Sequence, residues 1–252
     1  MKDKALRWMR KALLPLAFWL AVWALAARAV GQDLLVPSPA AVASRLTMVA
    51  TPAFWQSVGM TMARTAAAYL IGVAAACVLA LACHALPLLD DVVGPALAVV
   101  RATPVASFII LALVWLSSSN VPILAGALMV TPVVFANVRE GIDARDVRLL
   151  EMARMFSWSR LKTFRHVTLP SVLPTFLAAC EACVGLCFKA TIAAEVIGVP
   201  KNAVGTQMYN AKIYLETDAL MAWTVAVILL SMALEALLRR AFERGIRRGR
   251  HA

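Results

Sequence analysis

The chain has 252 residues, is 62% hydrophobic and carries a formal net charge of +11. With only 15% charged residues, this composition is more apolar than that of a soluble globular domain and is typical of a polytopic helical membrane protein. The positive charge does not indicate nucleic-acid binding, because the lysines and arginines flank apolar tracts and form no continuous basic face.

The first apolar run follows a short basic segment at the N-terminus. Residues 12–30 are long enough to cross a membrane, and we predict them to be the first span. A cleaved signal peptide is the alternative, because Ala27-Arg28-Ala29 loosely resembles a cleavage site. The run is longer than the apolar core of most signal peptides, which favours an uncleaved span.

Three further spans are expected before the chain becomes polar. Residues 57–83 form an alanine-rich second span, whose small side chains suit close helix packing in lipid. The third span, 98–116, is irregular, and an interfacial helix over 92–100 is left open. Arg101 is expected at its cytoplasmic interface. Residues 121–138 form the fourth span, in which neighbouring helices can accommodate prolines.

A long polar stretch, 139–170, precedes the fifth span at 171–192 and the sixth at 219–238. With six spans, 18 of the 25 lysines and arginines fall on one side of the membrane, in residues 1–11, 139–165 and 239–250. The positive-inside rule then places both termini and the polar stretch in the cytoplasm. We therefore expect an all-α, multi-pass protein that forms a single membrane domain over residues 1–252.

The polar stretch contains two amphipathic segments separated by Ser157-Trp-Ser159. Either Ser157 or Ser159 can cap the second segment. This pattern predicts a short helix–turn–helix, and an exposed apolar stripe on it indicates a partner surface. In the first segment, four apolar residues recur at helical spacing and therefore share one face: Leu149, Leu150, Ala153 and Phe156.

This stretch resembles the signature of binding-protein-dependent importer permeases. In that family, Glu-Ala-Ala is followed after three residues by glycine, and after nine more by a branched aliphatic residue, any residue and Leu-Pro. The family glycine falls on Ser157, for which we expect ordinary backbone angles rather than the positive φ that glycine permits. The matching residues are Glu151, Ala153, Val167, Leu169 and Pro170, with Met152 in the middle place.

Three other segments resemble the nitrate, taurine and aliphatic-sulfonate permeases of that family. They are Leu35-Val-Pro-Ser-Pro39 after the first span, Arg101-Ala-Thr-Pro104 at the third, and Ala194-Glu195-Val-Ile-Gly198 after the fifth. The resemblance implies the permease subunit of a type I ATP-binding-cassette importer in the bacterial cytoplasmic membrane. Its solute is expected to be a small anion such as nitrate, taurine or a sulfonate, or a related organic nutrient.

The resemblance also implies partners. Two permease subunits pair in the bilayer, here expected as a homodimer, and each docks a cytoplasmic ATPase while an extracytoplasmic binding protein delivers the solute. We expect no cofactor in this chain, since ATP and Mg²⁺ belong to the ATPase and the sequence has no phosphate-binding loop. The residues expected to couple the ATPase to the membrane domain are Glu151, Ala153, Ser157, Arg160, Leu169 and Pro170.

Charged residues in or beside the fifth span are candidates for the solute pathway. Lys189 and Glu181 lie eight residues apart, so they share a helix face without bonding directly. Lys189 either lines the pathway or extends to the outer interface. Glu195 either contacts the solute or caps a turn at the outer end.

Other functions fit the sequence less well. Cys180, Cys183 and Cys187 share a helix face, but they lack the ligand spacing of a zinc site, so we expect helix packing and no metal. No set of catalytic groups indicates an enzyme. A self-sufficient secondary transporter or channel is the alternative function, although it would not need an ATPase-docking loop.

Overall fold

The computed structural model describes the backbone of residues 2–249 and the side chains of residues 13–240. The regular structure in this part of the chain is helical, which confirms the all-α prediction. The helices that are long and apolar enough to cross a membrane are α1 (Lys2–Val30), α3 (Pro52–Ala85), α6 (Val121–Asp143), α9 (Leu169–Gly198) and α11 (Thr217–Gly249). The shorter helices are α2 (Pro39–Arg45), α4 (Pro87–Ala102), α5 (Val105–Ala112), α7 (Val147–Met155), α8 (Arg160–Thr163) and α10 (Val204–Ile213).

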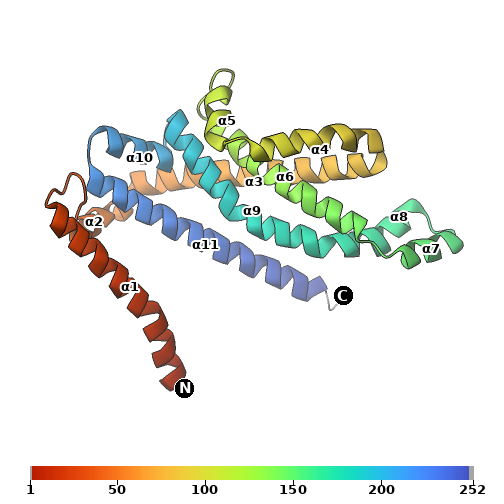
Figure 1. The fold of residues 1–252 in the computed structure, drawn as a ribbon, viewed down its shortest axis with the longest axis horizontal. Coiled ribbons are helices and arrows are strands. Elements are labelled where there is room, and N and C mark those ends of the chain that lie inside the picture. The colour runs from red at the N-terminus through yellow and green to blue at the C-terminus, as the bar shows by residue number, and fades with distance from the viewer. Residues whose placement is uncertain (1, 250–252) are drawn as a thin grey trace.

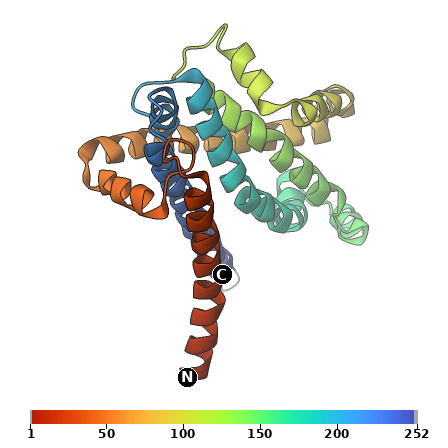
Figure 2. The same cartoon turned by 60° about the vertical axis from the view of Figure 1, so that its left-hand side comes forward.

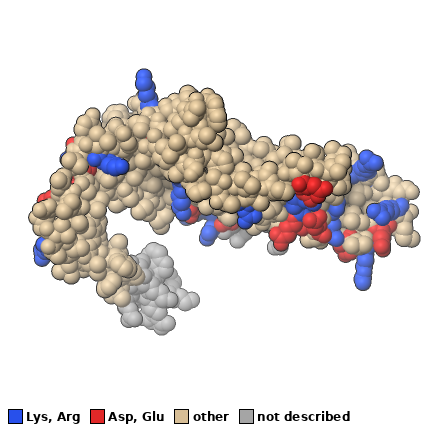
Figure 3. Space-filling model, turned by 45° about the horizontal axis from the view of Figure 1, so that its top comes forward, with Lys and Arg blue, Asp and Glu red and all other residues tan. Residues whose placement is uncertain are grey.

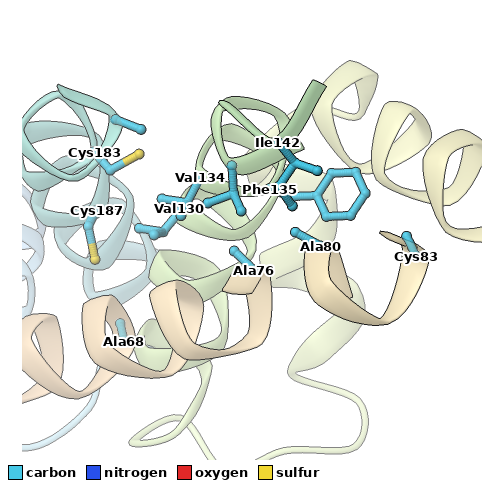
Figure 4. Packing of buried hydrophobic residues seen from close by; sticks show 12 residues of the cluster. Ala68, Ala76, Ala80, Cys83, Val130, Val134, Phe135, Ile142, Cys183 and Cys187 are labelled. Atoms are coloured by element: carbon cyan, nitrogen blue, oxygen red, sulfur yellow. The ribbon is translucent and has the colours of Figure 1, made fainter. Parts of the chain in front are cut away.

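The centre of the molecule is formed by α3, α6 and α9, which pack along much of their length (Figure 1). Small side chains allow the three backbones to approach closely in lipid. At Gly126 of α6 an added Cβ atom would lie 2.7 Å from the Cβ of Ala68, so this crossing requires glycine. Figure 4 shows the shared core, which includes Ala68, Ala76 and Ala80 of α3, Val130 and Val134 of α6, and Cys183 and Cys187 of α9.

The helix α1 extends away from this centre. Figures 1 and 2 both show that the C-terminal end of α1 lies near α2, whereas its N-terminal end points away from the other helices. A hydrogen bond of 3.0 Å from Trp23 Nε1 to the carbonyl of Pro37 holds its outer end. Only Ala27 is buried among residues 13–30, so this part of α1 presents a largely apolar surface to its surroundings on nearly all sides.

The third span differs from the prediction of one span over 98–116. The structure has two helices there, α4 and α5, bent by 101° at Thr103-Pro104. Proline has no N–H to donate and disfavours helical angles at its predecessor, and Thr103 is accordingly extended. Within residues 2–249, five helices are long and apolar enough to cross a membrane, or six if this bent pair counts as one span.

The position of Arg101 follows from the same bend. The helix α4 begins at Pro87, directly after α3, and runs back beside it (Figure 1). Arg101 lies in the last turn of α4, at the opposite end from the α3–α4 turn. If the α3–α4 turn is cytoplasmic, as the expected orientation requires, Arg101 lies away from the cytoplasmic end of α4, which does not support its expected place at that interface.

The other membrane helices extend beyond the apolar runs that predicted them. For example, α6 continues past residue 138 to Asp143, and α9 continues past residue 192 to Gly198. Hydropathy marks only the part of a helix that lies in hydrocarbon, whereas backbone hydrogen bonding continues into the polar interface.

Candidate coupling surface and solute pathway

The polar stretch between α6 and α9 folds as the predicted helix–turn–helix. Asp146 begins α7, because its carboxylate accepts a hydrogen bond of 2.8 Å from the amide of Arg148. At the other end, the amide of Ser157 donates to the carbonyl of Arg154 at 3.0 Å, and that of Trp158 donates to Ala153 at 2.9 Å. This pair of bonds defines a Schellman motif, which ends a helix and turns the chain sharply.

Ser157 occupies the left-handed position of this motif, with a φ of 52°. The expectation of ordinary backbone angles was wrong: the chain keeps the conformation that suits glycine, although the residue is serine. A left-handed conformation costs a non-glycine residue about 1–2 kcal/mol. The two backbone hydrogen bonds of the motif offset this cost, so the geometry of the turn is retained.

The second helix, α8, is capped by Ser159 and not by Ser157. Ser159 Oγ accepts a hydrogen bond of 3.3 Å from the amide of Lys162. The helix continues through a π-helical turn, Phe164–Thr168, directly into α9. Pro170 explains this wider turn, because it has no N–H to donate and its ring would clash with the carbonyl of a regular preceding turn.

The α7–α8 segment exposes large apolar side chains at the end of the helix bundle. Met155 is 85% exposed, Phe156 71% and Leu161 76%. Figure 3 shows charged atoms gathered at the end of the molecule that holds these two helices. We refer to Met155, Phe156 and Leu161 as the coupling patch. An apolar patch bordered by charge is typical of a protein–protein contact.

The residues predicted for coupling have different surroundings. Ala153 is buried, whereas Glu151, Ser157 and Arg160 are exposed. Leu169 is partly exposed, and Pro170 lies in the first turn of α9. The predicted apolar stripe divides into inward side chains such as Ala153 and outward ones such as Phe156.

A second candidate site lies between α9 and α11, as a cleft of about 470 Å³. Both Glu181 and Lys189 line it, so the two predicted pathway residues share one face. The Nε of Arg239 donates to Glu181 Oε1 at 2.8 Å, and Lys189 forms no ion pair within residues 13–240. Charges at membrane depth require water or another protein surface, which indicates that this open cleft does not face lipid.

Sequence reasoning missed two other charged residues in this cleft, Glu235 and Arg239. Glu235 lies inside the predicted sixth span, so the argument applied to Lys189 would have found it. Arg239 was assigned to the basic tail, because it directly follows that span. Gly185 of α9 leaves space for the Glu235 carboxylate, with which an added Cβ atom would collide.

The third pathway candidate, Glu195, is fully buried. Its carboxylate accepts hydrogen bonds from Thr61 Oγ1 at 2.8 Å, from an Arg64 guanidinium nitrogen at 3.1 Å and from the amide of Gly205 at 3.2 Å. These contacts join α3, α9 and the first turn of α10, so Glu195 caps α10 from inside the protein. Its burial and its bond to the amide of Gly205 favour the capping alternative over a contact with the solute.

Comparison with known proteins identifies the class of this fold. Residues 68–248 match the model of the family described as binding-protein-dependent transport system inner membrane component. This match covers well over half of the chain, and the protein therefore belongs to that family. The assignment confirms the resemblance predicted from the stretch between Glu151 and Pro170, and makes the chain a permease of the ATP-binding-cassette transporter class.

Particular relatives are similar along most of their length. The putative aliphatic sulfonates transport permease protein SsuC of Escherichia coli (strain K12) is 28% identical over 234 residues, which cover 89% of this chain and 87% of that protein. The taurine transport system permease protein TauC of the same organism is 23% identical over 225 residues, covering 86% and 81%.

A solved structure shares the fold. The crystal structure of an amino acid ABC transporter with histidines includes a chain that superposes with a TM-score of 0.66 at 22% identity. The superposition covers 79% of this chain and 97% of that one. It confirms the helical membrane architecture of an ATP-binding-cassette permease.

Proposed function

We propose that this protein is the permease subunit of an importer that is driven by a separate cytoplasmic ATPase. The coupling patch carries this proposal. Met155, Phe156 and Leu161 project from the turn that the Schellman motif and the Ser159 cap hold in place. A push on this turn reaches the core, because α8 continues without interruption into α9. ATP and Mg²⁺ belong to the ATPase in this proposal.

The proposed orientation places α7, α8 and both termini in the cytoplasm. The excess of lysine and arginine in 1–11, 139–165 and 239–250 supports it. An ATPase on the cytoplasmic side can reach the coupling patch only in this orientation, and the opposite side is then free for an extracytoplasmic binding protein.

We propose that a second copy of the chain completes the membrane domain. The charged cleft of Glu181, Lys189, Glu235 and Arg239 is open in the single subunit, where lipid would be an unfavourable neighbour. A facing copy would enclose these charges around a water-filled pathway. The extended helix α1, with little contact to its own subunit, is free to pack on such a copy.

The solute of this pathway is proposed to be a small organic anion of the sulfonate type. Lys189 supplies a positive charge to the cleft, and no carboxylate among residues 13–240 forms an ion pair with it. The printed names of two relatives, which refer to aliphatic sulfonates and taurine, point in the same direction.

Reconstitution tests this function. The permease, its ATPase and the binding protein are placed together in vesicles, and uptake of a radiolabelled alkanesulfonate is followed with and without ATP. The proposal predicts uptake that requires ATP and all three proteins. Uptake by the permease alone would overturn it in favour of a self-sufficient transporter or channel.

A further inference from the structure

A cationic cavity of about 760 Å³ lies between the end of α3 and the α7–α8 segment. Arg145, Arg154 and Arg160 all line it, and none of them forms an ion pair within residues 13–240. Arg145 is held in place by a 2.6 Å bond from its Nε to the carbonyl of Ile142. His84, at the end of α3, also lines the cavity. The three guanidinium groups therefore line one cavity that an anion can enter.

An apolar groove continues from this cavity toward the centre of the bundle. The two share Leu81, Phe164 and Thr168 as lining residues. From Thr168 the groove extends two turns along α9 to Phe176, a length of about 12 Å. No charged side chain lines it, and its volume is about 170 Å³. Its remaining walls are Cys77, Val138, Ile142, Leu169, Val172 and Leu173.

We propose that the cavity and the groove together bind one anionic phospholipid of the cytoplasmic leaflet. The phosphate lies among the three arginines, and part of an acyl chain occupies the groove. The proposal depends on the orientation proposed above, because that orientation places the cationic end at the cytoplasmic surface. Basic pockets between membrane helices on this side are suited to anionic headgroups.

The shape of the site favours a lipid over a free anion. Inorganic phosphate would satisfy the arginines but leave the groove empty. A side chain of the ATPase would do the same, since the groove lies at the depth of the membrane helices, beside the partly exposed Leu169 and Leu173. Trp158 lines the headgroup end, and the Lys162 amine lies 4.5 Å from its ring centre. Tryptophan is enriched at this interfacial level of membrane proteins.

The bound lipid would connect the coupling segment to the bundle. Ala153, Arg154 and Trp158 belong to the α7 end and its turn, whereas Leu81 and His84 belong to α3. A phospholipid that contacts both groups braces the coupling segment against α3. The site would therefore make the transporter sensitive to the content of anionic lipid in the membrane.

Native mass spectrometry of the assembled permease–ATPase complex tests this site. The complex is titrated with phosphatidylglycerol or with phosphatidylcholine, and retained lipid is counted. The proposal predicts selective retention of phosphatidylglycerol. Each arginine near a membrane surface contributes about fivefold in affinity, so Arg154→Gln with Arg160→Gln should weaken retention about thirtyfold. The matched control, Arg148→Gln with Arg165→Gln, removes two exposed arginines of the same segment outside the cavity and should change retention little.

Two further measurements separate the alternatives. Leu173→Trp fills the groove without changing charge and should also reduce retention. Inorganic phosphate, added in excess, should not displace the lipid. Displacement by phosphate, or retention unchanged by Leu173→Trp, would mean that the cavity binds only a phosphate group and would overturn the proposal. Lipid that binds only after the ATPase is removed would show that the ATPase covers the site, and would also overturn the proposal. These readouts do not depend on uptake, so they remain separate from a failure of the proposed function.

Discussion

Arg64 of α3 and Glu195 of α9 form an ion pair of 3.1 Å in the interior of the helix bundle. The pair is separated by 131 positions in the sequence, and Thr61 and Gly205 complete the hydrogen bonding of the carboxylate. Arg64 also donates to the carbonyl of Lys201 at 3.1 Å. This network fixes the connection between α9 and α10 to α3, and it has a structural role.

Removing the carboxylate should therefore destabilise the fold. Glu195→Ala leaves the Arg64 charge buried without its partner, which costs about 3–5 kcal/mol. Glu195→Gln keeps acceptor capacity for Thr61 and should lose less. Thermal unfolding of the detergent-purified permease measures both losses. The exposed pair Arg45–Asp218 provides a control, because Arg45→Gln should cost at most about 1 kcal/mol. A stable Glu195→Ala protein with a raised KM for solute would instead support a pathway role.

The strained turn at Ser157 predicts an unusual response to glycine. Ser157→Gly removes the left-handed strain of about 1–2 kcal/mol and adds about 0.5–1 kcal/mol of chain entropy to the unfolded state, so stability should stay equal or rise slightly. Ser157→Val should lower stability, since a β-branched residue suits positive φ least. The unfolding midpoints of the two variants provide the comparison. A clear loss of stability in Ser157→Gly is the result that this explanation does not allow.

Changing the coupling patch should affect the association of the ATPase and not the insertion of the permease. Phe156→Asp places a charge where an apolar contact is proposed, and co-purified ATPase should fall about tenfold or more, since burying an unpaired charge opposes docking. Phe156→Leu keeps an apolar surface and serves as the control. Equal amounts of ATPase with both variants would exclude Phe156 from the contact.

Lys189 should determine the preference for anions. Lys189→Met removes the positive charge from the cleft, and uptake of a sulfonate should fall about tenfold, the size expected for losing a hydrogen bond to a charged group. Lys189→Arg keeps the charge and should retain much of the uptake. Initial uptake rates in vesicles, normalised to the amount of assembled complex, measure both. Unchanged uptake by Lys189→Met would place this lysine outside the pathway.

Much of the membrane topology could be predicted from the sequence, because apolar length alone identifies the part of a helix that crosses lipid. The bend at Pro104 could not be predicted in this way, because hydropathy does not report the direction of a helix axis. The helices α4 and α5 share one nearly continuous apolar run. The backbone angles expected for Ser157 rested on the intrinsic preference of serine for negative φ. The two hydrogen bonds at the end of α7 outweigh that preference.

The candidate site was predicted less completely for a different reason. Glu195 and Lys189 are similar in the sequence, as single charges near the end of one apolar run. Only the packing of α3 against α9 distinguishes them, because it supplies Arg64 and Thr61 to the first and leaves the second in an open cleft. Such partners come from distant parts of the chain, where no local spacing relates them.

Chemical labelling of Leu161→Cys tests whether the coupling patch faces the cytoplasm and docks the ATPase. Leu161 is 76% exposed in the coupling patch, so a cysteine there should react readily with a membrane-impermeant maleimide. We expect labelling in inside-out vesicles from which the ATPase has been stripped, and protection once the ATPase is bound again. Labelling from the exterior of intact cells, or equal labelling with and without the ATPase, would contradict it.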